Sequence, residues 1–165
     1  MISKKICMLG AFSVGKTALV QQYVHSIFSD KYLSSVGVKI SKKELSVDGC
    51  DVTLVLWDME GKDLYANVNI SYLRGAMGYF LVVDGKRRET LQVAHELRNN
   101  AISIVGPKVP HYFLLNKADL EPEWEVSNDD IQTLHTQGIP FLKTSAKSGM
   151  GVEDAFVGLT RAMLL

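Results

Sequence analysis

The stretch Gly10-Ala11-Phe12-Ser13-Val14-Gly15-Lys16-Thr17 decides how the rest of the chain is organised. It matches the pattern G-x-x-x-x-G-K-[ST]. The residues before it, Lys4 to Leu9, form a short, mostly apolar run of the kind that makes a buried parallel strand. After it, apolar residues recur at helical spacing and share one helix face: Leu19, Val20, Tyr23, Val24 and Ile27. The stretch is therefore predicted to be a loop between a strand and a helix.

A loop of this kind binds phosphate groups. Its glycines let the backbone curl so that N–H groups point at phosphate oxygens, and the following helix N-terminus adds partial positive charge. Lys16 is expected to reach the β- and γ-phosphates, and the Thr17 hydroxyl to ligate Mg²⁺. The alternative, a glycine-rich turn that binds nothing, does not explain why strand, loop and helix agree. The residues expected around the phosphates are Ala11, Phe12, Ser13, Val14, Gly15, Lys16, Thr17 and Ala18.

The composition is that of an ordinary globular chain. Its 165 residues suggest one domain, and a formal net charge of zero gives no sign of a nucleic-acid or membrane surface. Cys7 and Cys50 form neither a CxxC pair nor a disulfide framework, so a reducing, cytoplasmic location is expected. The chain shows no membrane-length apolar run, no signal segment and no C-a-a-X box. We expect a monomer without a coded lipid anchor or a nucleic-acid partner.

Strand-like and helix-like segments alternate along the chain. Asp48-Gly49 is a hairpin signal between the first two of the later strands, and the lysines of the first mark it as an exposed edge. The alternation predicts an α/β fold: a six-stranded, mostly parallel sheet with one antiparallel edge strand and helices on both faces. The expected later strands are 39–47, 52–57, 79–83, 112–115 and 141–143, and the expected later helices are 91–105, 128–137 and 152–163.

The helix limits and the polar segments carry further expectations. Gly106-Pro107 is expected to stop the helix that ends at Val105, and either Ser127 or Asn128 to cap the next one. The trio Lys86-Arg87-Arg88 is interpreted as the solvated start of a helix. The remaining polar segments are expected to be a long exposed loop at 28–37, a partly helical stretch at 62–74 and a surface loop at 121–128.

Four loops that carry polar motifs all follow predicted strands. The carboxyl ends of parallel strands meet at one edge of an open α/β sheet, where ligands bind. Each motif alone is modest, but their convergence predicts a single pocket. The loops are Gly10–Thr17, the D-x-x-G segment Asp58–Gly61, the N-K-x-D segment Asn116–Asp119, and Thr144–Lys147.

With these motifs in this order and spacing, the chain resembles a Ras-superfamily small GTPase of the Rab branch. The segment Tyr32–Val38 is similar to switch I of that branch, and Ser71–Ala76 to the stretch after switch II. The resemblance extends over essentially the whole chain. It implies the P-loop NTPase fold as a single G domain over residues 1–165, with GTP or GDP and Mg²⁺ as ligands.

The resemblance also implies roles at the base. Asn116 and Asp119 read guanine, where a buried Asp119 carboxylate accepts from the ring N–H and the exocyclic amine and so rejects adenine. The stems of Lys117 and Lys147 pack along the nucleotide, and the Ala146 N–H binds the guanine oxygen. The base-side residues are Asn116, Lys117, Asp119, Ser145, Ala146 and Lys147.

Further roles are implied at the phosphates and the metal. Asp58 holds Mg²⁺ through water, and Gly61 offers its N–H to the γ-phosphate. Ser35 stands where the family has a Mg²⁺-ligating threonine, with Ser34 as a competing candidate. Phe28 matches the aromatic residue that packs against the base, although an ordinary core phenylalanine is the alternative. The metal ligands are thus predicted to be Thr17, Ser35 and Asp58.

Three departures bear on hydrolysis. Phe12 is bulky where relatives have a small residue, Glu60 adds negative charge, and Lys62 replaces the glutamine that orients water. A charged lysine cannot accept a hydrogen bond, although it could neutralise developing charge as an arginine finger does. The catalytic candidates are Lys16, Gly61 and Lys62.

Three functions remain open at this point. The first is a GTP/GDP switch with slow hydrolysis, and the second is a module that holds GTP without turnover. The third, a small-molecule kinase, is disfavoured because N-K-x-D points to guanine and no acceptor-binding insertion is present. Effectors and regulators are expected to bind switch I at about 29–38, switch II at about 59–74 and the lysine-bearing edge strand.

Overall fold

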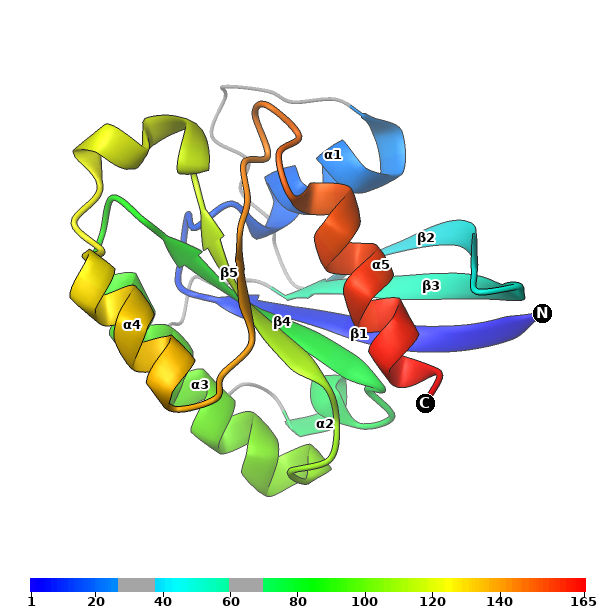
Figure 1. The fold of residues 1–165 in the computed structure, drawn as a ribbon. Coiled ribbons are helices and arrows are strands. Elements are labelled where there is room, and N and C mark those ends of the chain that lie inside the picture. Colours follow the sequence, from blue (N-terminus) through cyan, green and yellow to red (C-terminus); the bar gives the residue numbers. More distant parts are fainter. Residues whose placement is uncertain (27–37, 60–69) are drawn as a thin grey trace.

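The structure, a computed structural model, describes residues 1–26, 38–59 and 70–165. In this part of the chain six strands form one sheet (Figure 1). All neighbouring strands pair in parallel except β2 and β3, which are antiparallel. The predicted α/β architecture, including its one antiparallel edge strand, is confirmed. The spatial order is β2 (Val38–Val47), β3 (Cys50–Met59), β1 (Ile2–Gly10), β4 (Gly78–Asp84), β5 (His111–Asn116) and β6 (Phe141–Lys143).

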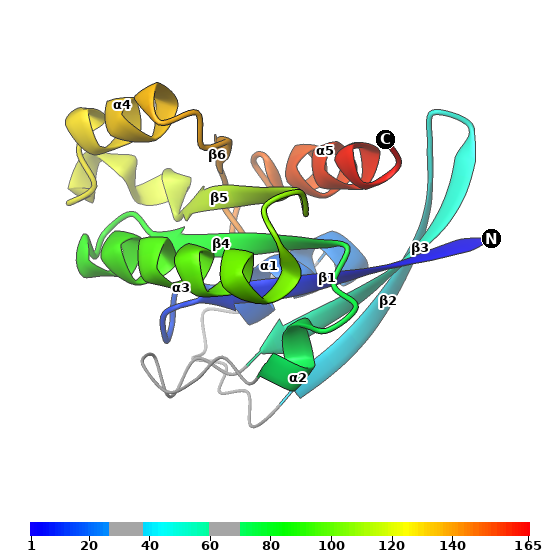
Figure 2. The ribbon, with the colours of Figure 1, turned by 90° about the horizontal axis from the view of Figure 1, so that it is seen from below.

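Helices cover both faces of the sheet. Every residue of β4 is buried, which requires cover on both sides of that strand. Helices α2 (Ile70–Leu73) and α3 (Glu89–Val105) lie on one side, and α5 (Val152–Met163) lies on the other (Figure 2). Helix α1 (Lys16–His25) packs on α5, where the rings of Tyr23 and Phe156 stack at 4.1 Å. No helix in the described ranges is both long and apolar enough to cross a bilayer.

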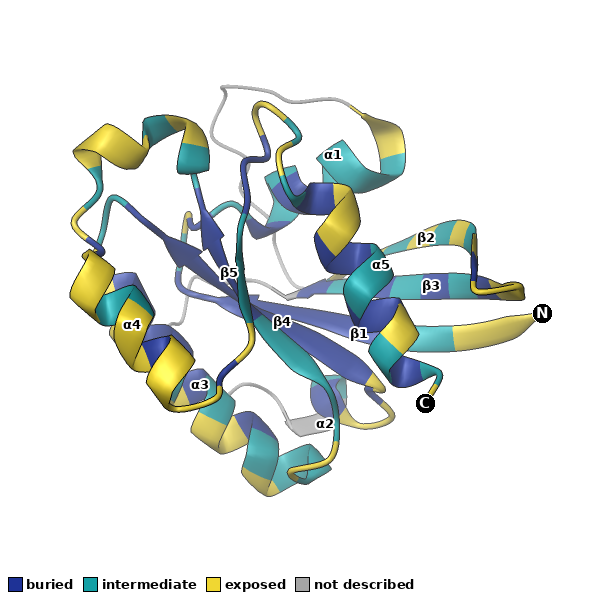
Figure 3. Cartoon of the chain, viewed as in Figure 1, coloured by how far each residue is buried: buried dark blue, intermediate teal, exposed yellow. Residues whose placement is uncertain are grey.

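The β2–β3 hairpin turns as its sequence predicts. Asp48 and Gly49 both have positive φ, 51° and 81°, as the two central residues of a type I′ turn require. Arg161 of α5 reaches across to Asp48, with 2.8 Å between Nε and Oδ2. Strand β2 is the sheet edge, and exposed and intermediate residues alternate along it (Figure 3). Lys39 and Lys42 are among its exposed residues. The lysines on this edge hinder pairing with another chain.

The helix limits follow local capping chemistry. Helix α3 ends at Val105, before Gly106, whose φ is 92°. Helix α4 (Asn128–Thr136) is capped by Ser127, whose hydroxyl accepts from the Asp130 N–H while the Asp130 carboxylate accepts from the Ser127 N–H. Of the two capping candidates the structure selects Ser127, and α4 ends one residue before the predicted Gln137.

The predicted surface loop at 121–128 is helical at its start. Residues Ala118–Glu123 form the 3-10 helix η1. Trp124 is half-buried, and its Nε1 donates to the Lys117 carbonyl at 2.8 Å. Its ring lies where a side chain on Gly85 would stand, since a Cβ there would come within 2.1 Å of it. The predicted loop at 28–37 lies outside the described residues, as does most of the predicted helical stretch at 62–74, of which α2 is the described end.

Candidate nucleotide-binding site

Three of the four motif-bearing segments line one pocket at the carboxyl edge of the sheet. Its volume is about 240 Å³. The start of α1 forms one wall, the end of β5 with η1 a second, and the loop after β6 a third. Among the lining residues only Leu120 was not predicted from the sequence. The pocket is lined by Gly15, Ala18, Asn116, Lys117, Asp119, Leu120, Ala146 and Lys147.

The phosphate loop is tightly wound between β1 and α1. Gly15 has a φ of 104°, and a Cβ there would come within 2.3 Å of the Asn116 Nδ2, so no larger residue fits. Lys16 is buried, and its Nζ donates to the carbonyl oxygens of Gly10 and Ala11 at 3.0 and 2.9 Å. The ammonium therefore lies against the loop, at the positive end of α1, where it adds to an anion-binding surface.

Both polar atoms of the Asn116 amide form hydrogen bonds to other segments of the protein. Its Nδ2 donates to the Val14 carbonyl at 2.9 Å, and its Oδ1 accepts from the Thr144 hydroxyl at 3.1 Å. Both Asn116 and Thr144 are buried, so these bonds are shielded from water. The residue predicted to read the base thus ties the phosphate loop to the ends of β5 and β6.

Asp119 stands at the mouth of the pocket. Its Oδ1 accepts from the Ser145 hydroxyl at 2.7 Å, and the same hydroxyl accepts from the Ser148 N–H at 3.0 Å. The expectation that Asp119 is buried is wrong, because this residue lies in η1, which has no buried residue, and is exposed. Ala146 is buried and Lys147 is exposed beside it.

Thr17 and Asp58 bring a hydroxyl and a carboxylate together beside the phosphate loop. The Thr17 Oγ1 donates to the Asp58 Oδ2, and Asp58 is only 2% exposed near the end of β3. These oxygen donors fit Mg²⁺, which is commonly held by one or two protein oxygens together with phosphates and water. Over the described ranges there is no group of three or more His, Cys, Asp or Glu residues that could hold a metal alone. The remaining predicted residues, Phe28, Ser34, Ser35, Glu60, Gly61 and Lys62, lie outside the described residues.

Comparison with known proteins gives the family. The model described as "Ras family" matches residues 5–165. The chain belongs to the Ras family. It is 30% identical over 162 residues to the Ras-related protein Rab-13 of Bos taurus, an alignment that covers 98% of this chain and 80% of the relative. It is 34% identical over 163 residues to Rab-7a of Dictyostelium discoideum, covering 95% of this chain and 80% of that relative.

Membership confirms the resemblance to the Rab-like branch. This Ras-family protein is a small GTP-binding protein, its nucleotides are GTP and GDP, and its metal is Mg²⁺. Members of the family hydrolyse GTP and bind effectors and regulators.

Three residues that contact predicted site residues were not themselves predicted: Asp84, Arg87 and Thr144. Asp84 ends the fully buried strand β4 at the ligand edge of the sheet, and that position was the available signal. Thr144 immediately precedes the Ser145-Ala146-Lys147 motif. The interpretation of Lys86-Arg87-Arg88 as a solvated helix start is wrong for Arg87, whose Nη2 donates to the Phe12 carbonyl at 2.6 Å.

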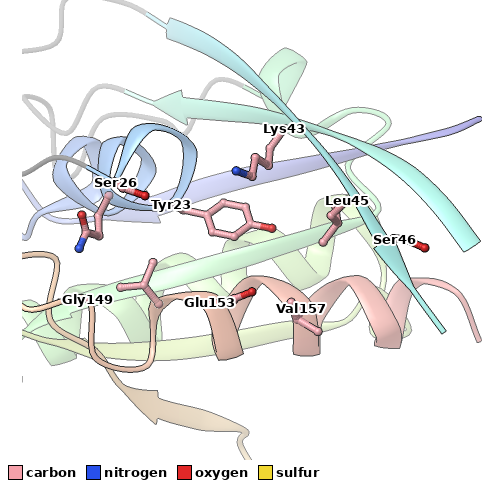
Figure 4. A pocket seen from close by; sticks show the side chains of 10 residues that line it. Tyr23, Ser26, Lys43, Leu45, Ser46, Gly149, Glu153 and Val157 are labelled. Atoms are coloured by element: carbon pink, nitrogen blue, oxygen red, sulfur yellow. The ribbon is translucent and has the colours of Figure 1, made fainter. Parts of the chain in front are cut away.

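A second cavity, of about 350 Å³, lies between α1, β2 and α5 (Figure 4). It shares no lining residue with the nucleotide pocket. Tyr23, Lys43 and Glu153 line it, and burial together with the Glu153 charge raises the pKa of Tyr23 to about 12. The phenol therefore stays protonated at neutral pH.

Proposed function

We propose that this protein is a GTP/GDP-dependent switch that cleaves GTP slowly without a partner. It acts as one G domain over residues 1–165, as a cytoplasmic monomer. The observation that supports this most strongly is the continuity of the two halves of the site. Gly15 of the phosphate loop and Asn116 of the N-K-x-D motif line the same pocket and lie in contact. A base and its phosphates can therefore be bound together.

Asp119 is proposed as the residue that selects guanine. Guanine offers a ring N–H and an exocyclic amine side by side, and a carboxylate can accept from both. Adenine lacks this pair and would not supply the two donors that the carboxylate accepts from guanine. The Ser145 hydroxyl supports this role because it fixes one Asp119 oxygen. Lys117 and Lys147 would cover the base with their stems, with Phe28 packing against it, and the Ala146 N–H would bind the guanine oxygen.

The phosphates are proposed to lie on the loop from Ala11 to Ala18. Lys16 would move its ammonium from the Gly10 and Ala11 carbonyls to the β- and γ-phosphates. Thr17 and Asp58 would hold Mg²⁺, together with Ser35, and the metal neutralises charge on the phosphates. The Gly61 N–H is proposed to bind the γ-phosphate.

Slow hydrolysis is proposed because Lys62 stands in place of a water-orienting glutamine and Phe12 is bulky. In single-turnover assays we expect GTP to be converted to GDP and phosphate far more slowly than by Ras proteins that carry the glutamine. Lys62→Ala would slow the reaction further if Lys62 stabilises developing charge. A rate like that of those Ras proteins, unchanged by Lys62→Ala, would contradict this part of the proposal.

A GTP-holding scaffold is the second candidate. Phe12, Glu60 and Lys62 favour it, whereas Lys16, Thr17, Asp58 and Gly61 favour a working cycle. The nucleotide that remains bound after purification separates the two. Retained GTP supports the scaffold, and retained GDP supports turnover.

The partner surface is proposed to be switch I, switch II and strand β2. The described part of this surface supports the assignment, because Ile40 is 51% exposed between the exposed Lys39 and the half-buried Ser41. An exposed apolar residue among polar neighbours on a sheet edge is suited to protein contact.

Asp119→Asn tests guanine selection. The amide presents a donor where guanine also has donors, so we expect the preference for GDP over ADP to fall by about a hundredfold or more. Glu121→Gln is the matched control, since Glu121 pairs with Lys143 and does not line the pocket. If Asp119→Asn keeps the wild-type preference for GDP over ADP, Asp119 does not select guanine.

A further inference from the structure

The carboxylate of Asp84 accepts hydrogen bonds from two basic side chains beside the phosphate loop. It is 2% exposed at the end of β4. Its Oδ2 accepts from the Lys117 Nζ at 2.8 Å and from the Arg87 Nε at 3.0 Å, while its Oδ1 accepts from the Lys86 N–H at 2.9 Å. Burial alone would raise the pKa of Asp84, but the hydrogen bonds from Lys117, the Lys86 N–H and Arg87 outweigh it and hold the pKa below its usual value. The carboxylate is therefore charged at neutral pH.

Both basic side chains also contact backbone carbonyls of the phosphate loop. The Arg87 Nη2 donates to the Phe12 carbonyl at 2.6 Å, and the Lys117 Nζ lies 3.5 Å from the Ser13 carbonyl. Ser13 has a φ of 60°, a left-handed conformation that costs free energy in any residue but glycine. The two contacts flank this strained residue, so they oppose its relaxation.

We propose that Arg87 is a positioning residue for the phosphate loop, whose guanidinium bridges the Asp84 carboxylate and the Phe12 carbonyl. The inference deepens the proposed function and rests on nucleotide binding by this loop. Arg87 does not line the nucleotide pocket, so it acts through the loop backbone. The bridge needs two donors held in one plane, which the guanidinium has. A lysine ammonium at the same position keeps the charge but lacks this fixed fork.

Arg87→Lys therefore separates positioning from simple attraction of phosphates. If Arg87 acted only as a positive charge, the lysine would preserve its effect. Arg88→Lys is the matched control, because Arg88 is the next residue and also forms a two-pronged contact. That contact is with Asp130, at 3.0 Å from Nε and 2.8 Å from Nη2, away from the loop.

The experiment measures release of a fluorescent GDP analogue from the full chain in the presence of Mg²⁺. We expect Arg87→Lys to release the analogue about tenfold faster than the wild type, since a hydrogen bond involving a charged group is lost at the loop. Arg88→Lys should change the rate less than about twofold, because the Arg88 guanidinium contacts Asp130 and not the phosphate loop. The bridge is present without nucleotide, so the melting temperature of nucleotide-free Arg87→Lys should fall slightly. With GDP bound, the fall should be larger, because the loop then also holds the phosphates less well.

Release from Arg87→Lys at the wild-type rate would overturn the inference. So would a fall in melting temperature of equal size with and without nucleotide, which indicates a general structural role. Failure of the wild type to bind the analogue would overturn the proposed function and this inference together. Binding by the wild type with normal release from Arg87→Lys would overturn the inference alone.

Discussion

Thr144→Val removes one hydroxyl from the centre of the site and keeps the shape of the side chain. Thr144 and Asn116 are 0% and 1% exposed, and 3.1 Å separates their oxygen atoms. Without the hydroxyl, the Asn116 amide oxygen loses its donor where water does not reach. Leaving a buried acceptor in this condition costs about 1–3 kcal/mol.

The same change should weaken nucleotide binding. The Asn116 amide that accepts from Thr144 also donates to the Val14 carbonyl in the phosphate loop. Once the oxygen is released, the amide can rotate and the loop loses a fixed contact. We expect the dissociation constant for GDP to rise by about three- to tenfold, which corresponds to about 1 kcal/mol.

Thr160→Val is the matched control. Thr160 is also 0% exposed, but its hydroxyl donates to the Phe156 carbonyl within α5, at 2.6 Å and far from the pocket. That carbonyl keeps its place in the helix ladder, so the expected loss is less than about 1 kcal/mol with no change in affinity. Urea unfolding should be measured without nucleotide, because bound GDP adds its own stabilisation. If Thr144→Val loses no more stability than Thr160→Val and binds GDP normally, the reasoning about Asn116 is refuted.

Two further predictions concern titrating groups. Hydrogen bonds from Arg88 lower the pKa of Asp130 from 3.8 to about 2, against the opposing effect of its burial and with help from Ser127. The charged Asp130 carboxylate therefore stabilises the fold above about pH 4, and this stabilisation is lost as the pH falls towards 2. Asp130→Asn should lower the free energy of unfolding by about 1 kcal/mol near pH 7, a modest amount because solvent screens the exposed Arg88. Near pH 3 the loss should be smaller. Equal urea stabilities of variant and wild type near pH 7 would contradict this. Burial raises the pKa of Cys7 to about 11, with Lys5 opposing, while Cys50 is exposed. A thiol reagent should therefore modify Cys50 quickly in the folded protein and Cys7 only in denaturant, and rapid reaction of both thiols in the folded protein would show that reasoning to be wrong.

Much of the fold could be predicted because it depends on local patterns. The fully apolar run of β4 indicates a strand covered on both faces, and Asp48-Gly49 carries the positive φ angles of its turn. The lysines of β2 mark the sheet edge. Where local chemistry left a choice, as between Ser127 and Asn128 at the start of α4, the capping geometry decided it. The segment 118–123 was missed because its 3-10 helix is short and contains Pro122.

By itself, the sequence determined the order of strands and helices and the four motifs that follow the carboxyl ends of strands. These follow from the chemical nature of each residue and its near neighbours. Only the tertiary structure decided which side chains touch inside the site. The Asn116 amide donates to the carbonyl of Val14, 102 residues away in the sequence. The Arg87 guanidinium donates to the carbonyl of Phe12, 75 residues away. Periodicity indicates which face of an element is buried, but the partner of a polar group depends on how distant segments pack.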